Sequence, residues 1–237
     1  MISSEASVVT ARRSYEFHPD NLRLAAIAAP LVQTQLRAAL GFQSSGVGPP
    51  MPTFGPVTVA QPAGVVFDWG GYLTEEGVLI PIRFLHFEAT RVVLDVLGES
   101  SAIDTVYAIV ISTLKSVALG MGEPILGESA QRYDYSELTL SSSFDLIELL
   151  RPQVGQLLTS QATKDIIGGV LVPSYIFQAV PGETAYQGAL GLQQYVLQAR
   201  AGKRPGEHVL FSGAPLATDA HAEYLRSLSS SLMDTDV

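Results

Sequence analysis

Two stretches in the first half of the chain repeat apolar residues with a helical period. The first carries apolar side chains at nearly 3.6-residue spacing, at Leu24, Ile27, Leu31, Leu36 and Leu40. It predicts helix between residues 21 and 42, with Pro30 kinking this helix or starting a new one and Gly41 ending it.

The second helical pattern runs from residue 102 to residue 117. Its apolar side chains share one helix face and are Ile103, Val106, Tyr107, Val110, Leu114 and Val117. Ser101 is expected to cap this helix, with Asp104 completing an S-x-x-D motif, and Gly120 and Gly122 are expected to end it. A last helix, capped by Thr218 or Asp219, is predicted at the C-terminal end.

Extended patterns fill the regions between these helices. Residues 64–69 and 72–74 flank Gly70-Gly71, which suits a tight hairpin turn. Residues 78–87 and 90–97 form one long extended run, which is expected to break near residues 88–90. Further strands are predicted at 131–140, 170–180, 193–200 and 208–213.

The clustering of strands between single helices predicts an α+β fold, with a mostly antiparallel sheet built from meanders and helices packed on one face. We expect an N-terminal arm and helix (1–42), a linker or loop with five prolines (43–63), an α+β domain (64–232) and a frayed tail (233–237). Aligning Gly98 with Gly213 also matches Val110 with Leu225, which suggests β-β-β-α-like halves at 64–130 and 131–232. Two helices of equal period also match by chance.

Composition bears on the surface and on possible partners. Charged residues make up only 16% of the 237, against a usual share of about 25%, and lysine occurs three times against eleven arginines. This scarcity predicts that part of the surface contacts protein, either a second copy of the chain or another protein. The net charge of −9 argues against nucleic acid as a partner.

Other bulk features exclude classes of site. The absence of cysteine rules out disulfides, iron–sulfur clusters and cysteine nucleophiles. No apolar stretch reaches the roughly 18–20 residues that cross a bilayer, and the first residues carry no secretory pattern, so we expect no membrane and a cytoplasmic location. No phosphate-binding loop, nucleophile elbow or zinc-protease motif is present, so no cofactor or metal is predicted.

His86 and Glu88 are the main catalytic candidates. On a strand their side chains share one face, where they could act as a base and its orienting acid. A metal site would need further ligands, and the sequence supplies none at a suitable spacing. The simpler interpretation is a polar stripe on the sheet, with Arg83 or Arg91 as partner.

Aromatic residues supply the binding or interface candidates. Asp68, Trp69 and Tyr72 could form a ligand wall or an interface anchor, or could be cross-strand packing. Tyr133 and Tyr135 share a strand face that could line a dimer seam or groove, with plain sheet packing equally compatible.

Arg200, Lys203 and Arg204 form a basic hairpin loop that could bind an anion or an acidic partner, or could simply be solvated.

These features favour a non-catalytic, self-associating binding or assembly subunit. The alternative is a small-molecule-binding protein or enzyme whose sheet-lined pocket uses His86 and Glu88. A third hypothesis is an adaptor that docks a partner through residues 43–63.

Overall fold

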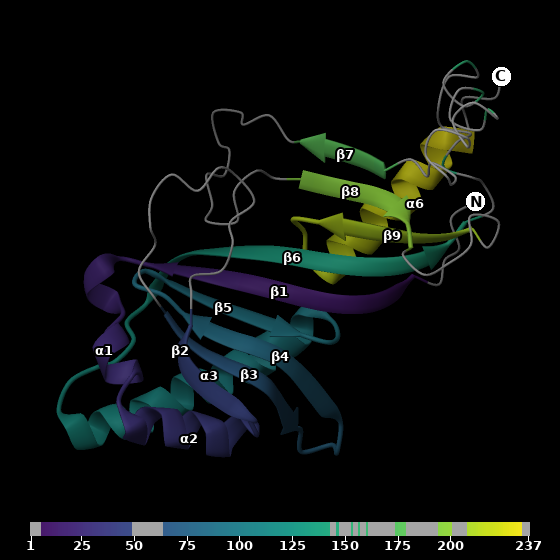
Figure 1. The fold of residues 1–237 in the computed structure, drawn as a ribbon. Coiled ribbons are helices and arrows are strands. Elements are labelled where there is room, and N and C mark those ends of the chain that lie inside the picture. Colours follow the sequence, from purple (N-terminus) through teal and green to yellow (C-terminus); the bar gives the residue numbers. More distant parts are fainter. Residues whose placement is uncertain are drawn as a thin grey trace.

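The computed structural model describes residues 6–48, 64–142, 174–178, 194–200 and 208–233, together with 146, 153, 156 and 160. They form a nine-stranded antiparallel sheet in the order β2-β3-β4-β5-β1-β6-β9-β8-β7 (Figure 1). The strands are β1 (Ser7–Phe17), β2 (Ser44–Gly48), β3 (Gly64–Leu73), β4 (Leu79–Phe87), β5 (Arg91–Val96), β6 (Ser129–Ser141), β7 (Ser174–Gln178), β8 (Gln194–Ala199) and β9 (Val209–Ala214). The predicted α+β fold is confirmed.

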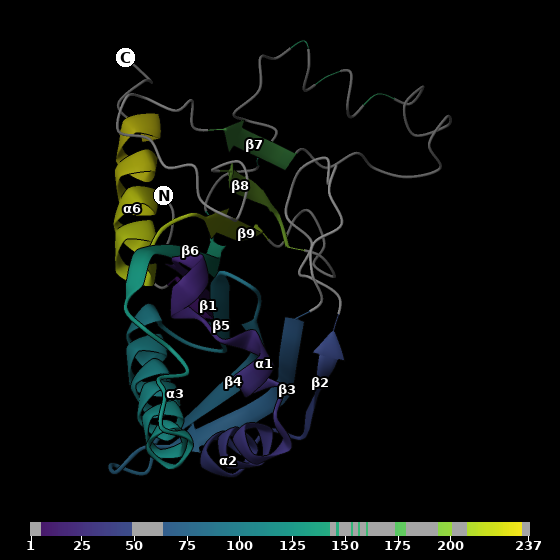
Figure 2. The same ribbon diagram turned by 90° about the vertical axis from the view of Figure 1, so that its left-hand side faces the viewer.

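The helices pack on one face of this sheet, as Figure 2 shows for α3 and α6. They are the 3₁₀ turn η1 (Pro19–Asn21), α1 (Leu24–Ile27), α2 (Pro30–Leu40), α3 (Ser100–Met121) and α6 (Thr218–Met233). Pro30 starts α2 and Gly41, with φ +58°, ends it, as the sequence predicts.

The sheet consists of two halves that meet at the β1–β6 pair. From that pair outward, one half runs β1-β5-β4-β3 and the other β6-β9-β8-β7, and in each the last strand along the chain leads into a helix, α3 or α6. Val96 pairs with Ala11, and Ala214 pairs with Ser136. Each residue of β5 and α3 therefore corresponds to the residue of β9 and α6 whose number is 118 higher. The sequence alignment of Gly98 with Gly213 implies a difference of 115, so it is displaced from the structural match by three residues.

Two expectations about the strands are wrong. The segment expected to be an arm contains β1, the strand at the centre of the sheet. The polar residues of this strand are typical of a solvated segment, so the pattern did not indicate a central strand. In the structure Thr10 and Arg12 instead bind Asp95, at 2.8 and 2.9 Å. Residues Ser7–Phe17 are therefore part of the core sheet and not a separate arm.

The second wrong expectation is a turn at Gly70-Gly71. Strand β3 runs through both glycines, and the hairpin turns at residues 74–78, where Gly77 has φ +77°. Gly70 is required for another reason: a Cβ there would lie 2.5 Å from the Leu40 carbonyl oxygen and 2.7 Å from the Phe42 ring. The glycine allows α2 to approach the sheet closely.

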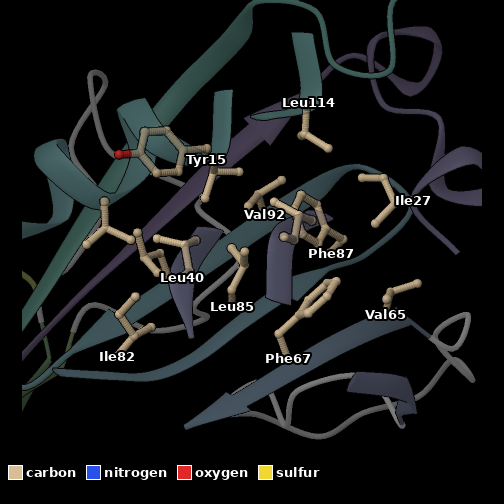
Figure 3. Packing of buried hydrophobic residues seen from close by; sticks show 14 of the residues in the cluster. Tyr15, Ile27, Leu40, Val65, Phe67, Ile82, Leu85, Phe87, Val92 and Leu114 are labelled. Atoms are coloured by element: carbon tan, nitrogen blue, oxygen red, sulfur yellow. The ribbon is translucent and has the colours of Figure 1, made fainter. Parts of the chain in front are cut away.

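Each half buries its own apolar cluster. The larger one lies between β1, β3–β5 and helices α1–α3, and includes Phe67, Leu85 and Phe87 (Figure 3). The smaller one lies between β6, β8, β9 and α6, around Leu138, Leu197 and Leu225. Of the expected linker, residues 44–48 form the edge strand β2, and residues 49–63 lie outside the described residues.

Candidate functional site

His86 and Glu88 do come together, but inside the protein. Their side chains approach to 3.5 Å, and Arg91 donates to Glu88 at 2.9 Å. His86 is almost fully buried, and a Cβ at Gly64 would lie 2.3 Å from its Nε2. Burial lowers the pKa of His86, against the opposing effect of Glu88, so the ring is neutral at pH 7.

The described cavities lie elsewhere. One of about 680 Å³ lies between α2 and α3, lined by residues such as Leu31, Ala38 and Ser112. Another of about 560 Å³ lies between the end of α3 and residues 122–126. Neither is lined by His86 or Glu88. Within the described part of the chain, no three metal-ligating side chains gather.

The three residues predicted around the β3 hairpin do not form one surface. Trp69 is 55% exposed and has φ +48°, a left-handed backbone that is costly for a bulky side chain. Tyr72 instead packs against the apolar cluster beneath the helices. Asp68 is half-buried and lies 3.5 Å from the Ser44 hydroxyl. Trp69 alone presents a large exposed aromatic surface.

Tyr133 and Tyr135 are held within the sheet. Tyr133 is buried and donates to the Gln131 side chain. Tyr135 lies beside the Arg12 guanidinium, 5.7 Å from its ring centroid, and burial raises the pKa of Tyr135 to about 12. Both tyrosines therefore make contacts inside the chain.

The predicted basic loop is described only at its start. The Arg200 guanidinium donates to the Thr139 hydroxyl on β6. Lys203 and Arg204 lie outside the described residues.

The outer face of α3 is a candidate that sequence reasoning missed. Only Asp104 and Lys115 are charged among its 22 residues, and Leu119 is 87% exposed. A helix that covers a sheet in water normally carries charged side chains on its outer face. The sequence signal for it is the scarcity of charge, since residues 100–121 include only Asp104 and Lys115 as charged side chains.

Small and uncharged side chains dominate this face. Its exposed positions are Ser101, Asp104, Thr105, Ala108, Ser112, Lys115, Ser116 and Leu119. On either side of it lie the two cavities described above, and Leu31 and Met121 add exposed apolar surface nearby. We call these eight positions the α3 outer face.

By length and hydropathy α3 could also cross a membrane, with a mean hydropathy of 1.5 over its most apolar window. It instead packs on the sheet through residues such as Ile103, Val106 and Val110, which are fully buried. Only 22% of that window is buried, so the rest of α3 stays on the surface.

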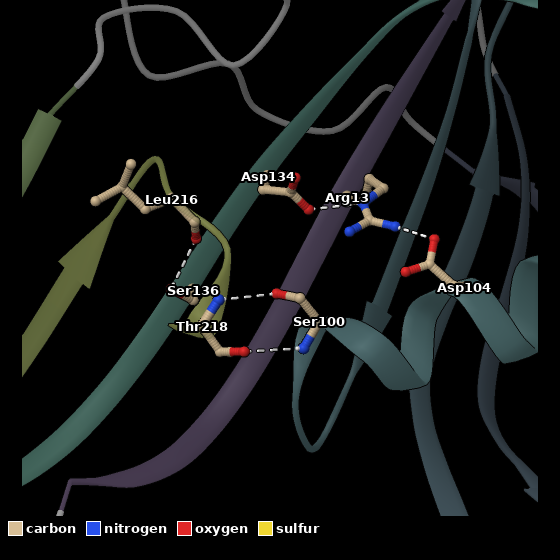
Figure 4. A network of polar contacts seen from close by, with 7 residues as sticks. All are labelled: Arg13, Ser100, Asp104, Asp134, Ser136, Leu216 and Thr218. Atoms are coloured by element: carbon tan, nitrogen blue, oxygen red, sulfur yellow. Dashed lines mark hydrogen bonds and ion pairs between the residues drawn. The ribbon is translucent and has the colours of Figure 1, made fainter. Parts of the chain in front are cut away.

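The two halves are tied together where α3 and α6 begin. The Ser100 backbone N–H donates to the Thr218 hydroxyl at 3.2 Å, and the Thr218 N–H donates to the Ser100 hydroxyl at 3.1 Å (Figure 4). Each residue thus caps the helix of the other half. The expected cap at Ser101 is wrong, because α3 begins one residue earlier and Ser101 is exposed.

An ion pair network lies beside these caps. Buried Arg13 donates to Asp134 of the neighbouring strand at 2.6 Å and also to Asp104 of α3 (Figure 4). A buried guanidinium with two carboxylates is well compensated. The network fixes the N-terminal part of α3 over the β1–β6 pair.

Comparisons with known proteins supply no relative. The chain matches no family model, and a search of curated proteins finds no similar sequence. Any function must therefore be argued from the geometry.

Proposed function

We propose that this protein is a non-catalytic subunit that associates with itself, and that two copies meet through the α3 outer face. The observation that carries the proposal is the character of this face: a 22-residue helix with two charges, covering a sheet on one side and exposed on the other. Apolar and uncharged surface of this kind is typical of protein contacts.

The two charges indicate a second copy as the partner. Asp104 and Lys115 are eleven residues apart, which is three turns plus about 20°, so they lie on the same face. Around a two-fold axis between residues 109 and 110, two antiparallel α3 helices would place each Asp104 opposite the partner's Lys115. The Asp104 side chain is 59% exposed and so remains accessible.

Small side chains near that axis suit close approach of two helices. Ala108 and Ser112 are exposed and lie near the middle of α3. Helix pairs with small residues at the contact approach to the short end of the usual 8–10 Å range. We also propose that the protein is cytoplasmic. In that aqueous setting the α3 outer face would be covered by the second copy.

A pocket enzyme using His86 and Glu88 has weaker support. Both side chains are buried, and the described cavities are lined by other residues. A general base must reach a substrate in a site that solvent can enter.

Light scattering coupled to size exclusion tests the proposal between about 1 and 100 µM, a range that includes the dissociation constants of micromolar dimers. We expect a dimer that Ala108→Arg converts to monomer, because two guanidinium groups would meet at the axis. Ala220→Arg is the matched control, since Ala220 is an exposed alanine on α6. A wild-type monomer throughout would overturn self-association, and a dimer that survives Ala108→Arg would overturn the α3 contact.

A further inference from the structure

His221 is a fully buried histidine where α6 meets the sheet. It lies at the end of the first turn of α6, with its Nδ1 2.9 Å from the Ser136 hydroxyl and its Nε2 2.8 Å from the Ser212 hydroxyl. The ring therefore joins three elements, namely α6, β6 and β9. Removing it from this position requires α6 to leave the sheet.

The hydrogen bonds define how the ring is protonated. Ser136 donates its proton to the Leu216 carbonyl oxygen at 2.8 Å, so it accepts from Nδ1–H of His221. Nε2 is then the acceptor for the Ser212 hydroxyl. His221 is neutral in this arrangement, and a second proton on Nε2 would force Ser212 to turn its own proton away, towards the Tyr195 hydroxyl oxygen at 3.3 Å.

Among the described residues, the elements packed against His221 place no free carboxylate beside its ring. On β6 the nearest acid along the same face, Asp134, is engaged by Arg13, which also holds Asp104 of α3. On α6, Asp219 and Glu223 are exposed. Strand β9 has no ionisable side chain.

Two further effects act against the imidazolium. Tyr195 of β8 packs edge-on against the ring at 6.0 Å and contacts Tyr224 of α6, so aromatic rings cover this side of His221. The N-terminal end of a helix carries positive partial charge, which opposes a cation there. Burial lowers the pKa of His221 to about 4, with no charged group contributing.

The corresponding positions in the other half are apolar. With the offset between halves, His221 matches Ile103 and Ser212 matches Leu94, while Ser136 matches Ala11 through the strand pairing. All three counterparts are fully buried. A polar trio thus stands in one half where the same fold uses hydrocarbon in the other.

We propose that His221 is an acid-sensitive latch: when it takes up a proton, α6 separates from β6 and β9, while the half built on β1–β5 stays folded. The buried His86 of that half differs from His221 in having an acid beside it, because Glu88 lies 3.5 Å from its Nδ1 and offsets part of the burial that lowers the pKa of His86. The latch acts on α6 and, through the caps shared by Ser100 and Thr218, on the first residue of α3, and it is independent of self-association.

Hydrogen exchange of the full chain, corrected for the intrinsic pH dependence of amide exchange, tests the latch. Between pH 7 and pH 5 we expect protection of α6 to fall about twentyfold more than protection of α3, which is the population shift for a histidine whose pKa rises from about 4 to 6.5 on opening. His221→Gln should abolish this difference, and His86→Gln should retain it.

Three results would overturn the latch: unchanged α6 protection at pH 5, equal loss of protection in α3 and α6, or a persistent difference in His221→Gln. If His221→Gln does not fold, the imidazole of His221 in the wild-type chain can be titrated by NMR. A midpoint well below 6 would support the latch, and a midpoint near 6.5 would overturn it.

Discussion

The two halves of the sheet share a strand order but differ in how they are stabilised. The half containing β1, β3, β4 and β5 is covered by α1, α2 and α3 and packs Phe67, Phe87 and Leu85 into a large apolar cluster. The other half, among its described residues, has α6 and a smaller cluster, and places His221 at the position of Ile103. At these matched positions one topology therefore tolerates hydrocarbon in one half and a polar trio in the other.

The two contacts between helix and sheet differ in their expected response to acid. Apolar contacts do not change with pH, whereas a neutral buried histidine is stable only while its ring stays unprotonated. The contact between α3 and the sheet at Ile103 is thus expected to be insensitive to acid, and the contact between α6 and the sheet at His221 is expected to respond to it. Common ancestry of the halves stays a prediction.

The largest expected effect comes from matched leucines in the two clusters. Leu85 and Leu197 occupy corresponding positions on β4 and β8, paired with Leu94 and Ser212, and both are buried. Leu85→Ala should cost about 4 kcal/mol in free energy of unfolding, and Leu197→Ala about 2 kcal/mol, within the 2–5 kcal/mol range of such truncations. The larger cost belongs to the larger cluster.

Urea denaturation measures both variants. Fluorescence of Trp69, the only tryptophan, reports on the first half, and far-UV circular dichroism reports on the whole chain. If Leu85→Ala and Leu197→Ala lost the same free energy of unfolding, the two apolar clusters would contribute equally to stability. The larger cluster would then not make its half the more stable one.

The next effect concerns pH. The pKa of His221 is about 4 in the folded protein, below its unfolded value of about 6.5. Between pH 6.5 and pH 4 the unfolded chain therefore binds more protons than the folded chain. The contribution of neutral His221 to the free energy of unfolding is fully present above pH 6.5 and is lost as the pH falls towards 4. From pH 7 to pH 5 the loss is about 2 kcal/mol.

His221→Ile should remove this part of the pH dependence. Each serine keeps a partner in that variant, because Ser136 still donates to Leu216 and Ser212 lies 3.3 Å from the Tyr195 hydroxyl. The remaining slope should match that of the other groups, including His86, whose pKa is also lowered by burial. A variant with the full wild-type slope would contradict the assignment to His221.

Much of the fold could be predicted because the apolar residues of each element, repeated at its own period, are the residues that it buries. The period of α3, Pro30 at the start of α2 and the break between β4 and β5 all follow from residue order. Strand β1 could not be found in this way, since the partners of Thr10 and Arg12 lie more than eighty residues away.

The candidate sites were harder to predict for a related reason. The sequence correctly grouped His86 with Glu88, because they are two residues apart on one chain segment. It could not bring His221 to Ser136, which is 85 residues away, or show that Tyr72 and Trp69 have different surroundings. A reversal of backbone handedness at Trp69 has no sequence signal.

The smallest expected effect concerns the reciprocal caps that join the halves. Ser100→Ala and Thr218→Val each remove one hydroxyl that accepts a helix N–H, and each should cost about 1 kcal/mol. Because the two bonds use different donors and acceptors, the double variant should lose about 2 kcal/mol in urea denaturation.

Ser101→Ala is the matched control for these caps. Ser101 is the exposed residue that the S-x-x-D pattern indicated, and its loss should change stability by less than about 0.5 kcal/mol. If Ser101→Ala were as costly as Ser100→Ala, α3 would be capped within its own half. The halves would then be joined mainly by the β1–β6 pairing and Arg13, and release of α6 would leave the start of α3 undisturbed.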